Sequence, residues 1–423
     1  MTTPVDLRLR DPSPELLGLP WLTPLAEWTP DVVPLRDIPV GPSRHLVRFV
    51  ALPDGLLAVK EAPGRIVRKE YDVLRALETR HMPAVRPMGM VLRSPEEEGL
   101  LLTRYLERSW QYRRLFMRLP LDATKQRGRL LAAMASLLVE LHRSGVFWGD
   151  CSLANTLFMR DGQTLQAHLV DAETSEILPR LTDGQRQHDL DIVVENVAGG
   201  LIDIATRLGA EHAIDEMIEA AESVAETYRG LWHELHHDLV LRLDERWQVD
   251  SRLRRLRELG YAVDEVRLET VQGGGDRLRV KVAVAGHDYH AEELRRLTGL
   301  AAGEGQADVL LNDVRAFAGR LQPTEDDESA GRRWRREVYE PLGARATAVA
   351  GAHTDAIQAY CDFLEVRWLL SEQKGRDVGD EAALSALRAR RTPVDSAASM
   401  SILEMPTGEM KPIVPGERDP DLT

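Results

Sequence analysis

The segment VFWGDCSLANTLF, residues 146–158, is the stretch around which the rest of the chain can be arranged. A long helical pattern, QRGRLLAAMASLLVELHRSG, precedes it at residues 126–145, with Gly145 standing where a helix is expected to end. A loop follows the short run VFWGD, and the apolar run TLFM comes after the loop at residues 156–159. Asp150 and Asn155 lie five residues apart in that loop. A chance D-x-x-x-x-N is common, but its position between a long helix and a short strand marks the loop as a candidate functional site.

The residues before this segment alternate between strand and helix patterns. Residues 44–61, RHLVRFVALPDGLLAVKE, are two apolar runs around a Pro-Asp-Gly turn, which predicts a hairpin. Residues 65–80 have apolar positions at helical spacing. Residues 84–93 and 99–107 read as two further strands. The order strand, strand, helix, strand, strand therefore leads into the long helix and its loop.

The residues after the segment change character. Residues 186–208 have a helical pattern, and residues 211–258 look long, helical and highly charged. Residues 261–285 predict a hairpin around three consecutive glycines. Residues 290–321 and 331–390 again read as helices.

Composition limits the function classes. The 423 residues are 43% hydrophobic and 29% charged, which is typical of a globular protein of two or three domains. The net charge of -14 argues against a protein that coats nucleic acid, because such binding uses clustered cations. The two cysteines, Cys151 and Cys361, give no disulfide framework. Because we find neither a signal peptide nor an apolar run near the ~20 residues of a membrane span, we expect a cytoplasmic protein.

Two charged residues that precede the loop, Lys60 and Glu70, stand at positions from which they could act together. Lys60 ends the apolar run LLAVKEA, so its ammonium can point into a cleft. Glu70 lies on the following predicted helix and could pair with Lys60. The alternatives are a solvated lysine at a sheet edge and a helix surface charge. Phosphoryl transfer needs such a cation on the phosphates, together with carboxylates for magnesium and for the attacking hydroxyl.

The residues that would meet the other requirements of phosphoryl transfer lie in the loop and after it. Asp150 would orient the substrate hydroxyl or accept its proton, and Asn155 would hold a metal ion. Asp171 follows an apolar strand in HLVDAETSE, where a second metal ligand belongs. Glu173 stands where the glycine of a D-F-G motif is expected, and it is a candidate auxiliary metal ligand.

With these motifs, residues 40–208 resemble the kinase-like superfamily. The likeness is greater to its lipopolysaccharide-kinase (Kdo/WaaP-type), RIO-type and aminoglycoside-phosphotransferase branches than to regulated protein kinases. The features behind it are Gly149 before Asp150, the D-x-E motif at Asp171 and Glu173, and the lack of an A-P-E segment. The rest of the chain resembles a C-terminal domain of unknown function that accompanies such kinase-like segments.

The resemblance implies ATP and Mg²⁺ as cofactors and assigns further residues. The segment LLLTRYLE resembles the strand and hinge that hold adenine, with backbone groups from Thr103 to Leu106, Tyr105 among them. Asp189 or Asp191 would support the catalytic loop from beneath. The nucleotide loop departs from the pattern, since it offers only Gly41 where backbone amides should approach phosphates. Arg44 could replace the missing amides with a cationic contact, and the alternative is an ordinary turn.

The expected fold class is α+β, with a bilobal protein-kinase-like domain followed by a mostly helical C-terminal domain that has a small β-hairpin. The boundaries we expect are an extended lead-in at 1–39, the kinase-like domain at 40–209, the C-terminal domain at 210–392 and a disordered tail at 393–423. Eight prolines in the lead-in favour extended chain with short helical turns.

The sequence favours an ATP-dependent phosphotransferase that acts on a hydroxyl of a small molecule, sugar, lipid-linked molecule or protein. The alternative is a pseudokinase scaffold whose C-terminal domain binds a protein partner. A third interpretation comes from HELHH, which places His233 and His237 on one helix face as in an H-E-x-x-H zinc site. Because no third ligand is apparent, a solvated helix is favoured there.

Overall fold

The computed structural model divides the chain into two compact units. Among the described residues, the first contains those up to Met159 together with Gln166–Glu226, and the second contains Arg160–Leu165 and those from Thr227 to Ala389. The predicted tail at 393–423 and Gly41 lie outside the described residues. The residues described are 6–38, 44–93, 97–119, 124–242, 245, 247–271, 277–321, 326–351 and 355–389.

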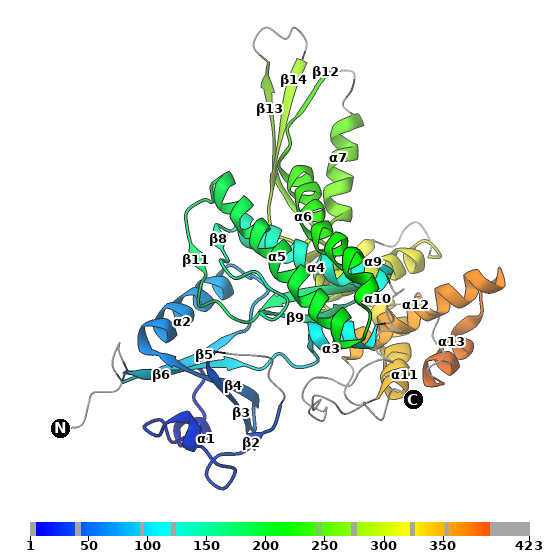
Figure 1. Cartoon of the computed structure of the whole chain (residues 1–423). Coiled ribbons are helices and arrows are strands. Elements are labelled where there is room, and N and C mark those ends of the chain that lie inside the picture. Colours follow the sequence, from blue (N-terminus) through cyan, green and yellow to red (C-terminus); the bar gives the residue numbers. More distant parts are fainter. Residues whose placement is uncertain are drawn as a thin grey trace. The chain divides into compact units, whose positions relative to one another are not determined.

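A six-stranded sheet in the order β1-β5-β6-β4-β3-β2 forms one part of the first unit (Figure 1). Every neighbouring pair of its strands is antiparallel. The predicted hairpin is confirmed, since β3 and β4 pair from Leu46↔Glu61 to Leu52↔Gly55. The strands are β1 (Asp6–Leu9), β2 (Leu35–Arg36), β3 (Leu46–Leu52), β4 (Gly55–Pro63), β5 (Pro87–Leu92) and β6 (Glu98–Arg104).

The N-terminal lead-in supplies both edge strands of this sheet. β1 pairs with β5 and β2 pairs with β3, so the expected extended chain is used for sheet pairing. Between them, α1 (Pro14–Leu17) and η1 (Leu25–Glu27) lie over one face of the sheet. Their buried side chains share a core cluster with those of the strands, because alternate strand residues face this side. The cluster includes Leu16, Trp21, Leu25, Trp28, Leu57 and Val59.

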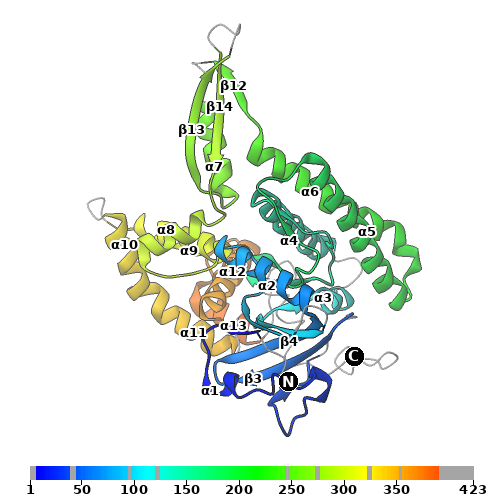
Figure 2. The ribbon, with the colours of Figure 1, turned by 90° about the vertical axis from the view of Figure 1, so that its left-hand side faces the viewer.

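Helix α2 (Gly64–Thr79) packs on β4, β5 and β6 (Figures 1 and 2). It begins directly after β4, as the helical pattern predicted. Its buried positions Val67, Tyr71, Leu74 and Leu77 follow helical spacing and form the face that meets the sheet. Because Leu57 and Val59 face the lead-in, strand alternation directs Lys60 to the face that α2 covers.

The rest of the first unit is mainly helical. The predicted long helix is confirmed as α4 (Thr124–Arg143), and Gly145 follows it with a φ of 75°. The helix expected at 186–208 is α5 (Asp183–Arg207). Short strands lie between these two helices, and β9 stands between β10 and β7 in a three-stranded sheet. The other elements are α3 (Tyr112–Arg118), β7 (Trp110–Gln111), β8 (Val146–Phe147), β9 (Thr156–Asp161), β10 (Thr164–Leu169), β11 (Glu176–Ile177) and the start of α6 (Ile214–His236).

The second unit contains a small sheet in the order β12-β14-β13. The predicted hairpin is confirmed by β13 (Val263–Thr270) and β14 (Arg277–Val284), although its glycine turn lies outside the described residues. The expectation of unbroken helix over 211–258 is wrong at β12 (Leu239–Arg242). This short LVLR run pairs with β14, and that long-range pairing overrides the local pattern. α7 (Trp247–Glu258) lies beside the sheet (Figure 2).

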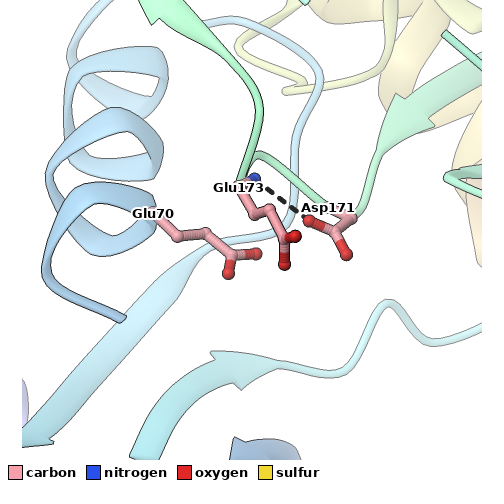
Figure 3. Close-up of side chains that lie close together, drawn as sticks. All are labelled: Glu70, Asp171 and Glu173. Atoms are coloured by element: carbon pink, nitrogen blue, oxygen red, sulfur yellow. Dashed lines mark hydrogen bonds between the residues drawn. The ribbon is translucent and has the colours of Figure 1, made fainter. Parts of the chain in front are cut away.

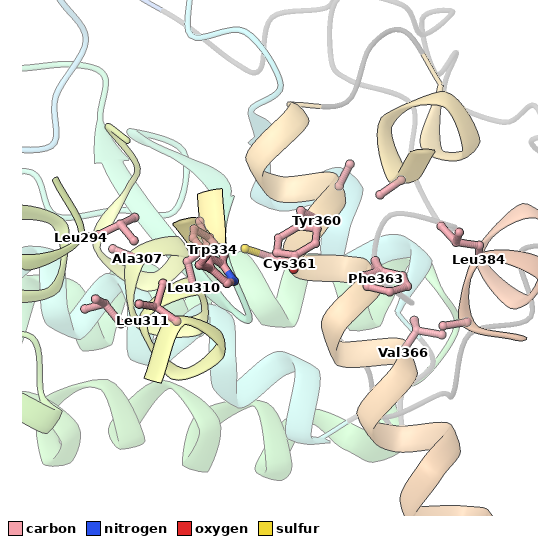
Figure 4. Close-up of a cluster of buried hydrophobic side chains, with 14 of the residues drawn as sticks. Leu294, Ala307, Leu310, Leu311, Trp334, Tyr360, Cys361, Phe363, Val366 and Leu384 are labelled. Carbon is pink, nitrogen blue, oxygen red and sulfur yellow. The ribbon is translucent and has the colours of Figure 1, made fainter. Parts of the chain in front are cut away.

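Helices make up the remainder of the second unit. Their core gathers Trp334, Tyr360, Cys361 and Phe363, all fully buried (Figure 4). Cys361 is a reduced thiol in this apolar cluster, and the other cysteine, Cys151, is also free and buried. The helices are α8 (Tyr289–Thr298), α9 (Glu304–Ala318), α10 (Asp327–Trp334), the π-helical turn η4 (Arg335–Tyr339), α11 (Glu340–Ala350), α12 (Ala356–Lys374) and α13 (Gly379–Arg388).

Candidate active site

Lys60 and Glu70 form an ion pair at the junction of β4 and α2. Nζ of Lys60 lies 3.0 Å from Oε2 of Glu70. The strand ends at Pro63 and the helix begins at Gly64, so the second turn of α2 lies opposite the end of β4. The Glu70 side chain is only 2% exposed, which makes this a desolvated pair and excludes the alternative of a helix surface charge.

Two more carboxylates meet the same ammonium group. Nζ of Lys60 lies 3.0 Å from Oδ2 of Asp171 and 3.3 Å from Oε2 of Glu173. The backbone N–H of Glu173 donates to Oδ1 of Asp171, which holds the D-x-E turn (Figure 3). Oε2 of Glu173 also lies 3.0 Å from Nε2 of His45. One oxygen from each of Glu70, Asp171 and Glu173 lies within 4.8 Å of the others, as in Figure 3.

The charges of this cluster shift the pKa values of its buried members. Burial, with the nearby Asp171 carboxylate, raises the pKa of Glu70 to about 7 despite the attraction of Lys60. Burial alone would lower the pKa of Lys60, but the Glu70 and Asp171 carboxylates outweigh it and raise that pKa above its ordinary value. Lys60 therefore keeps its charge, and the three carboxylates exceed the one ammonium in their midst.

Asp150 is held by two amide side chains. Nδ2 of Asn155 donates to Oδ2 of Asp150 at 3.0 Å and to its backbone oxygen at 3.2 Å. Nδ2 of Asn196, on α5, lies 3.4 Å from Oδ1 of Asp150 and donates to the carbonyl of Cys151 at 3.1 Å. The structure thus brings Asp150 and Asn155 together, and it adds Asn196, which the motif search missed.

Asp189 supports the catalytic loop from beneath. Its fully buried carboxylate accepts the backbone N–H groups of Trp148 at 2.8 Å and Gly149 at 2.9 Å, and it contacts Nε2 of His142 at 3.0 Å. Burial lowers the pKa of His142 although the contact with Asp189 opposes the shift. Of the two aspartates that the sequence left open, Asp191 instead accepts from Gln187 on the exposed side of α5.

The backbone conformation at position 149 explains why a glycine precedes Asp150. Gly149 has a φ of 79°, a region that residues with a Cβ avoid. A Cβ there would also lie 3.3 Å from Phe147 and from Thr174. Oγ1 of Thr174 donates to the carbonyl of Trp148 at 2.8 Å, so the chain after Asp171 is bonded to the catalytic loop.

The residues expected to hold the nucleotide are less fully positioned. Thr103 pairs with Ala58 in the sheet, and the N–H of Tyr105 donates to the carbonyl of Leu56 at 2.9 Å. The Tyr105 ring packs edge-on against Phe49, with centroids 5.6 Å apart. Arg44 is exposed at the start of the hairpin. Their roles toward adenine and phosphate stay predictions, and that of Gly41 falls outside the described residues.

The H-E-x-x-H sequence on α6 is arranged differently from a zinc site. Rings of His233 and His237 stack with centroids 4.5 Å apart. The guanidinium of Arg252 approaches His237, with Nη1 2.7 Å from Nε2, and also pairs with Glu234. A cation at this position opposes a metal ion. Among the described residues, the acidic cluster around Lys60 is the group with metal-ligand spacing.

Comparisons with known proteins agree with these features. Residues 57–206 match the model of the lipopolysaccharide kinase (Kdo/WaaP) family. Residues 230–390 match a domain of unknown function, DUF4032. Both resemblances expected from the sequence are confirmed. No curated protein matches the chain. A solved structure described as WaaP in complex with acyl carrier protein is similar with a TM-score of 0.32 and 17% identity, over 53% of this chain and 99% of that chain.

Two site residues were not assigned from the sequence. Asn196 follows Asp189 by seven residues, or two helical turns, and this spacing on one face of α5 was a usable signal. His45 had no such signal, because its contact with Glu173 joins residues 128 positions apart. In the part of the chain that the structure describes, every helix is too short or too polar to cross a membrane.

Proposed function

We propose that this protein transfers the γ-phosphoryl group of ATP, with Mg²⁺, to a hydroxyl acceptor. The observation that carries the proposal is the convergence of Lys60, Asp171 and Glu173 beside the Asp150 loop, within a segment that matches a kinase family. The geometry provides one cation for phosphates and an excess of carboxylates for a metal.

The residues fit a divalent cation. Glu70, Asp171 and Glu173 offer oxygens within 4.8 Å of one another, and Mg²⁺ prefers such oxygen ligands. Glu70 is committed to Lys60, so we assign Asp171 and the amide oxygen of Asn155 as ligands, with Glu173 as an auxiliary one. When bound, the metal would neutralise charge on the phosphates during transfer.

Asp150 is the residue we assign to the acceptor. Its carboxylate is fixed by Asn155 and Asn196, so it can orient a hydroxyl without losing side-chain freedom at that moment. The acceptor oxygen bonds to the γ-phosphorus while the bond from that phosphorus to the β–γ bridging oxygen breaks. ADP leaves, and the hydroxyl proton passes to Asp150 or to solvent. Lys60 would hold the α- and β-phosphates throughout.

We also propose that residues 40–209 act as the catalytic domain and residues 210–392 as an accompanying domain that can receive a protein partner. The family match favours a sugar or lipid-linked acceptor, because it is a lipopolysaccharide kinase family. A small molecule or a protein acceptor would use the same Asp150 chemistry, since the fold does not set the substrate.

The test is transfer of label from γ-labelled ATP, first with no added acceptor and then with cell extract. We expect Mg²⁺-dependent label transfer in the wild type that is lost in Asp171→Ala. Asp191→Ala is the matched control, because Asp191 is exposed on α5 and accepts a hydrogen bond from Gln187 on the same helix. Folded wild-type protein without transfer would reject the proposal and favour a pseudokinase scaffold.

A further inference from the structure

The hairpin of β9 and β10 carries a proposed metal residue at each end. Asn155 directly precedes β9, and Asp171 follows the last residue of β10 by two positions. The backbone N–H of Val170 donates to the carbonyl of Asn155 at 3.1 Å, which ties the two ends together. The tip of this hairpin, Arg160–Leu165, consists of the end of β9, a two-residue turn and the start of β10, and it belongs to the second unit.

A buried ion pair holds Arg160, the first residue of the hairpin tip. Nη1 and Nη2 of Arg160 contact Oδ2 and Oδ1 of Asp362, on α12, at 2.9 and 2.5 Å. Both side chains are less than a tenth exposed. Such a bidentate pair fixes orientation as well as distance, because the planar guanidinium matches the carboxylate.

The next residue caps a helix. The carboxylate of Asp161 accepts the N–H groups of Gly305 at 2.8 Å and Gln306 at 2.9 Å, at the start of α9. The N-cap of α9 is Gly303, which has no side chain to accept these groups. Asp161 therefore completes the helix from outside it, with its charge at the positive end of the helix dipole.

Gly162, the first residue of the turn, both donates a hydrogen bond to one side chain and accepts one from it. The N–H of Gly162 donates to Oε1 of Gln358 at 2.9 Å, and Nε2 of Gln358 donates to the carbonyl of Gly162 at 2.8 Å. The approach is very close, since a Cβ on Gly162 would lie 2.4 Å from the carbonyl oxygen of Gly305. Gly162 also has a φ of 64°. Only glycine fits there.

We propose that Asp362, Gln358 and the N-terminus of α9 form a clamp whose role is to position Asn155 and Asp171 through the β9–β10 hairpin. The inference rests on the proposed function of those two residues. The clamp holds the last two residues of β9 and the first residue of the turn through buried polar groups, whereas the tip of a hairpin ordinarily lies at the surface. Arg160, Asp161 and Gly162 are thus positioning residues of the β9–β10 hairpin.

The experiment compares hydrogen exchange of full-length wild type, Asp362→Ala and Gln358→Leu. The readout is the exchange of peptides that contain Val170, whose amide bonds to Asn155. The matched control is Arg367→Ala, which removes an α12 side chain that pairs with Asp377 and Asp380 instead of the turn. Circular dichroism and thermal unfolding show which variants are folded, and Gln358→Leu serves if Asp362→Ala is not.

We expect exchange at Val170 to rise about tenfold in the clamp variants and to stay at the wild-type rate in Arg367→Ala. Unchanged exchange in a folded clamp variant, or an equal rise in the control, would overturn the inference. A parallel titration with Mg²⁺ and ATP separates the two proposals. A wild type that does not bind them contradicts the proposed function, while exchange still decides the clamp.

Discussion

Lys60 donates to Glu70 across the junction of β4 and α2, with Nζ 3.0 Å from Oε2 and the carboxylate almost fully buried. This pair fixes the ammonium where Asp171 and Glu173 also meet it. The positive charge of Lys60 offsets part of the repulsion among the three carboxylates. The carboxylates therefore keep this arrangement only while Lys60 stays in place.

Glu70→Gln should therefore weaken ATP use. The amide keeps the size of the side chain but removes the charge that orients Lys60, so we expect kcat/KM for ATP to fall about 10- to 100-fold. Steady-state kinetics measure the effect. Glu78→Gln is the control on the same helix, because Glu78 pairs with Arg10 and Arg86 and not with Lys60. Equal kinetics for wild type and Glu70→Gln would contradict the assigned role.

Asn196→Ala should lower the rate of transfer without changing ATP binding. Asn196 touches Asp150 and the Cys151 carbonyl, so its loss frees the carboxylate that we propose orients the acceptor. We expect kcat to fall about tenfold, which corresponds to about 1.4 kcal/mol, with an unchanged KM for ATP. A higher KM for ATP with an unchanged kcat would argue that Asn196 acts on the nucleotide instead.

Asp189→Asn should destabilise the first unit. The variant keeps the shape of the side chain but presents an NH₂ group to backbone donors from Trp148 and Gly149. We expect a loss of about 2–4 kcal/mol in the free energy of unfolding, measured with urea. The exposed Asp191→Asn variant should change it by less than about 0.5 kcal/mol. Similar losses in both variants would remove the distinction between the two aspartates.

The free energy of unfolding should also depend on His168 at acidic pH. Burial on β10 lowers the pKa of His168 to about 4. Below its ordinary pKa, the unfolded chain takes up a proton that the folded chain refuses, so stability falls as pH drops from about 6.5 to about 4. We expect a loss of about 2 kcal/mol between pH 7 and pH 5 that is absent from His168→Leu. Urea unfolding at both pH values measures this, and parallel losses in the two proteins would refute it.

Local patterns predicted the parts of the fold that depend on neighbouring residues. The β3–β4 hairpin, α2 and α4 were confirmed because turn residues and apolar spacing are local properties. Asp150 and Asn155 could be paired because both belong to one loop. β12 was missed because its partner β14 lies about forty residues away, beyond any local pattern.

The long-range contacts of the site could not be foreseen in the same way. Asp189 and Asp191 are alike in sequence, and only the helix phase of α5 decides that Asp189 is buried beneath the loop. The contact of Arg160 with Asp362 joins residues 202 positions apart, and no composition or spacing indicates it. Such contacts depend on how the elements pack, which one sequence does not reveal.

The most direct measurement is the rate of γ-phosphate transfer by Asp150→Asn relative to the wild type, with saturating Mg²⁺ and ATP and with the acceptor present in cell extract. We predict that Asp150→Asn still binds ATP and Mg²⁺ but transfers label about 10²- to 10⁴-fold more slowly, because it cannot accept the hydroxyl proton. Equal transfer by both proteins would contradict the role of Asp150, and no transfer by folded wild type would contradict the phosphotransferase itself.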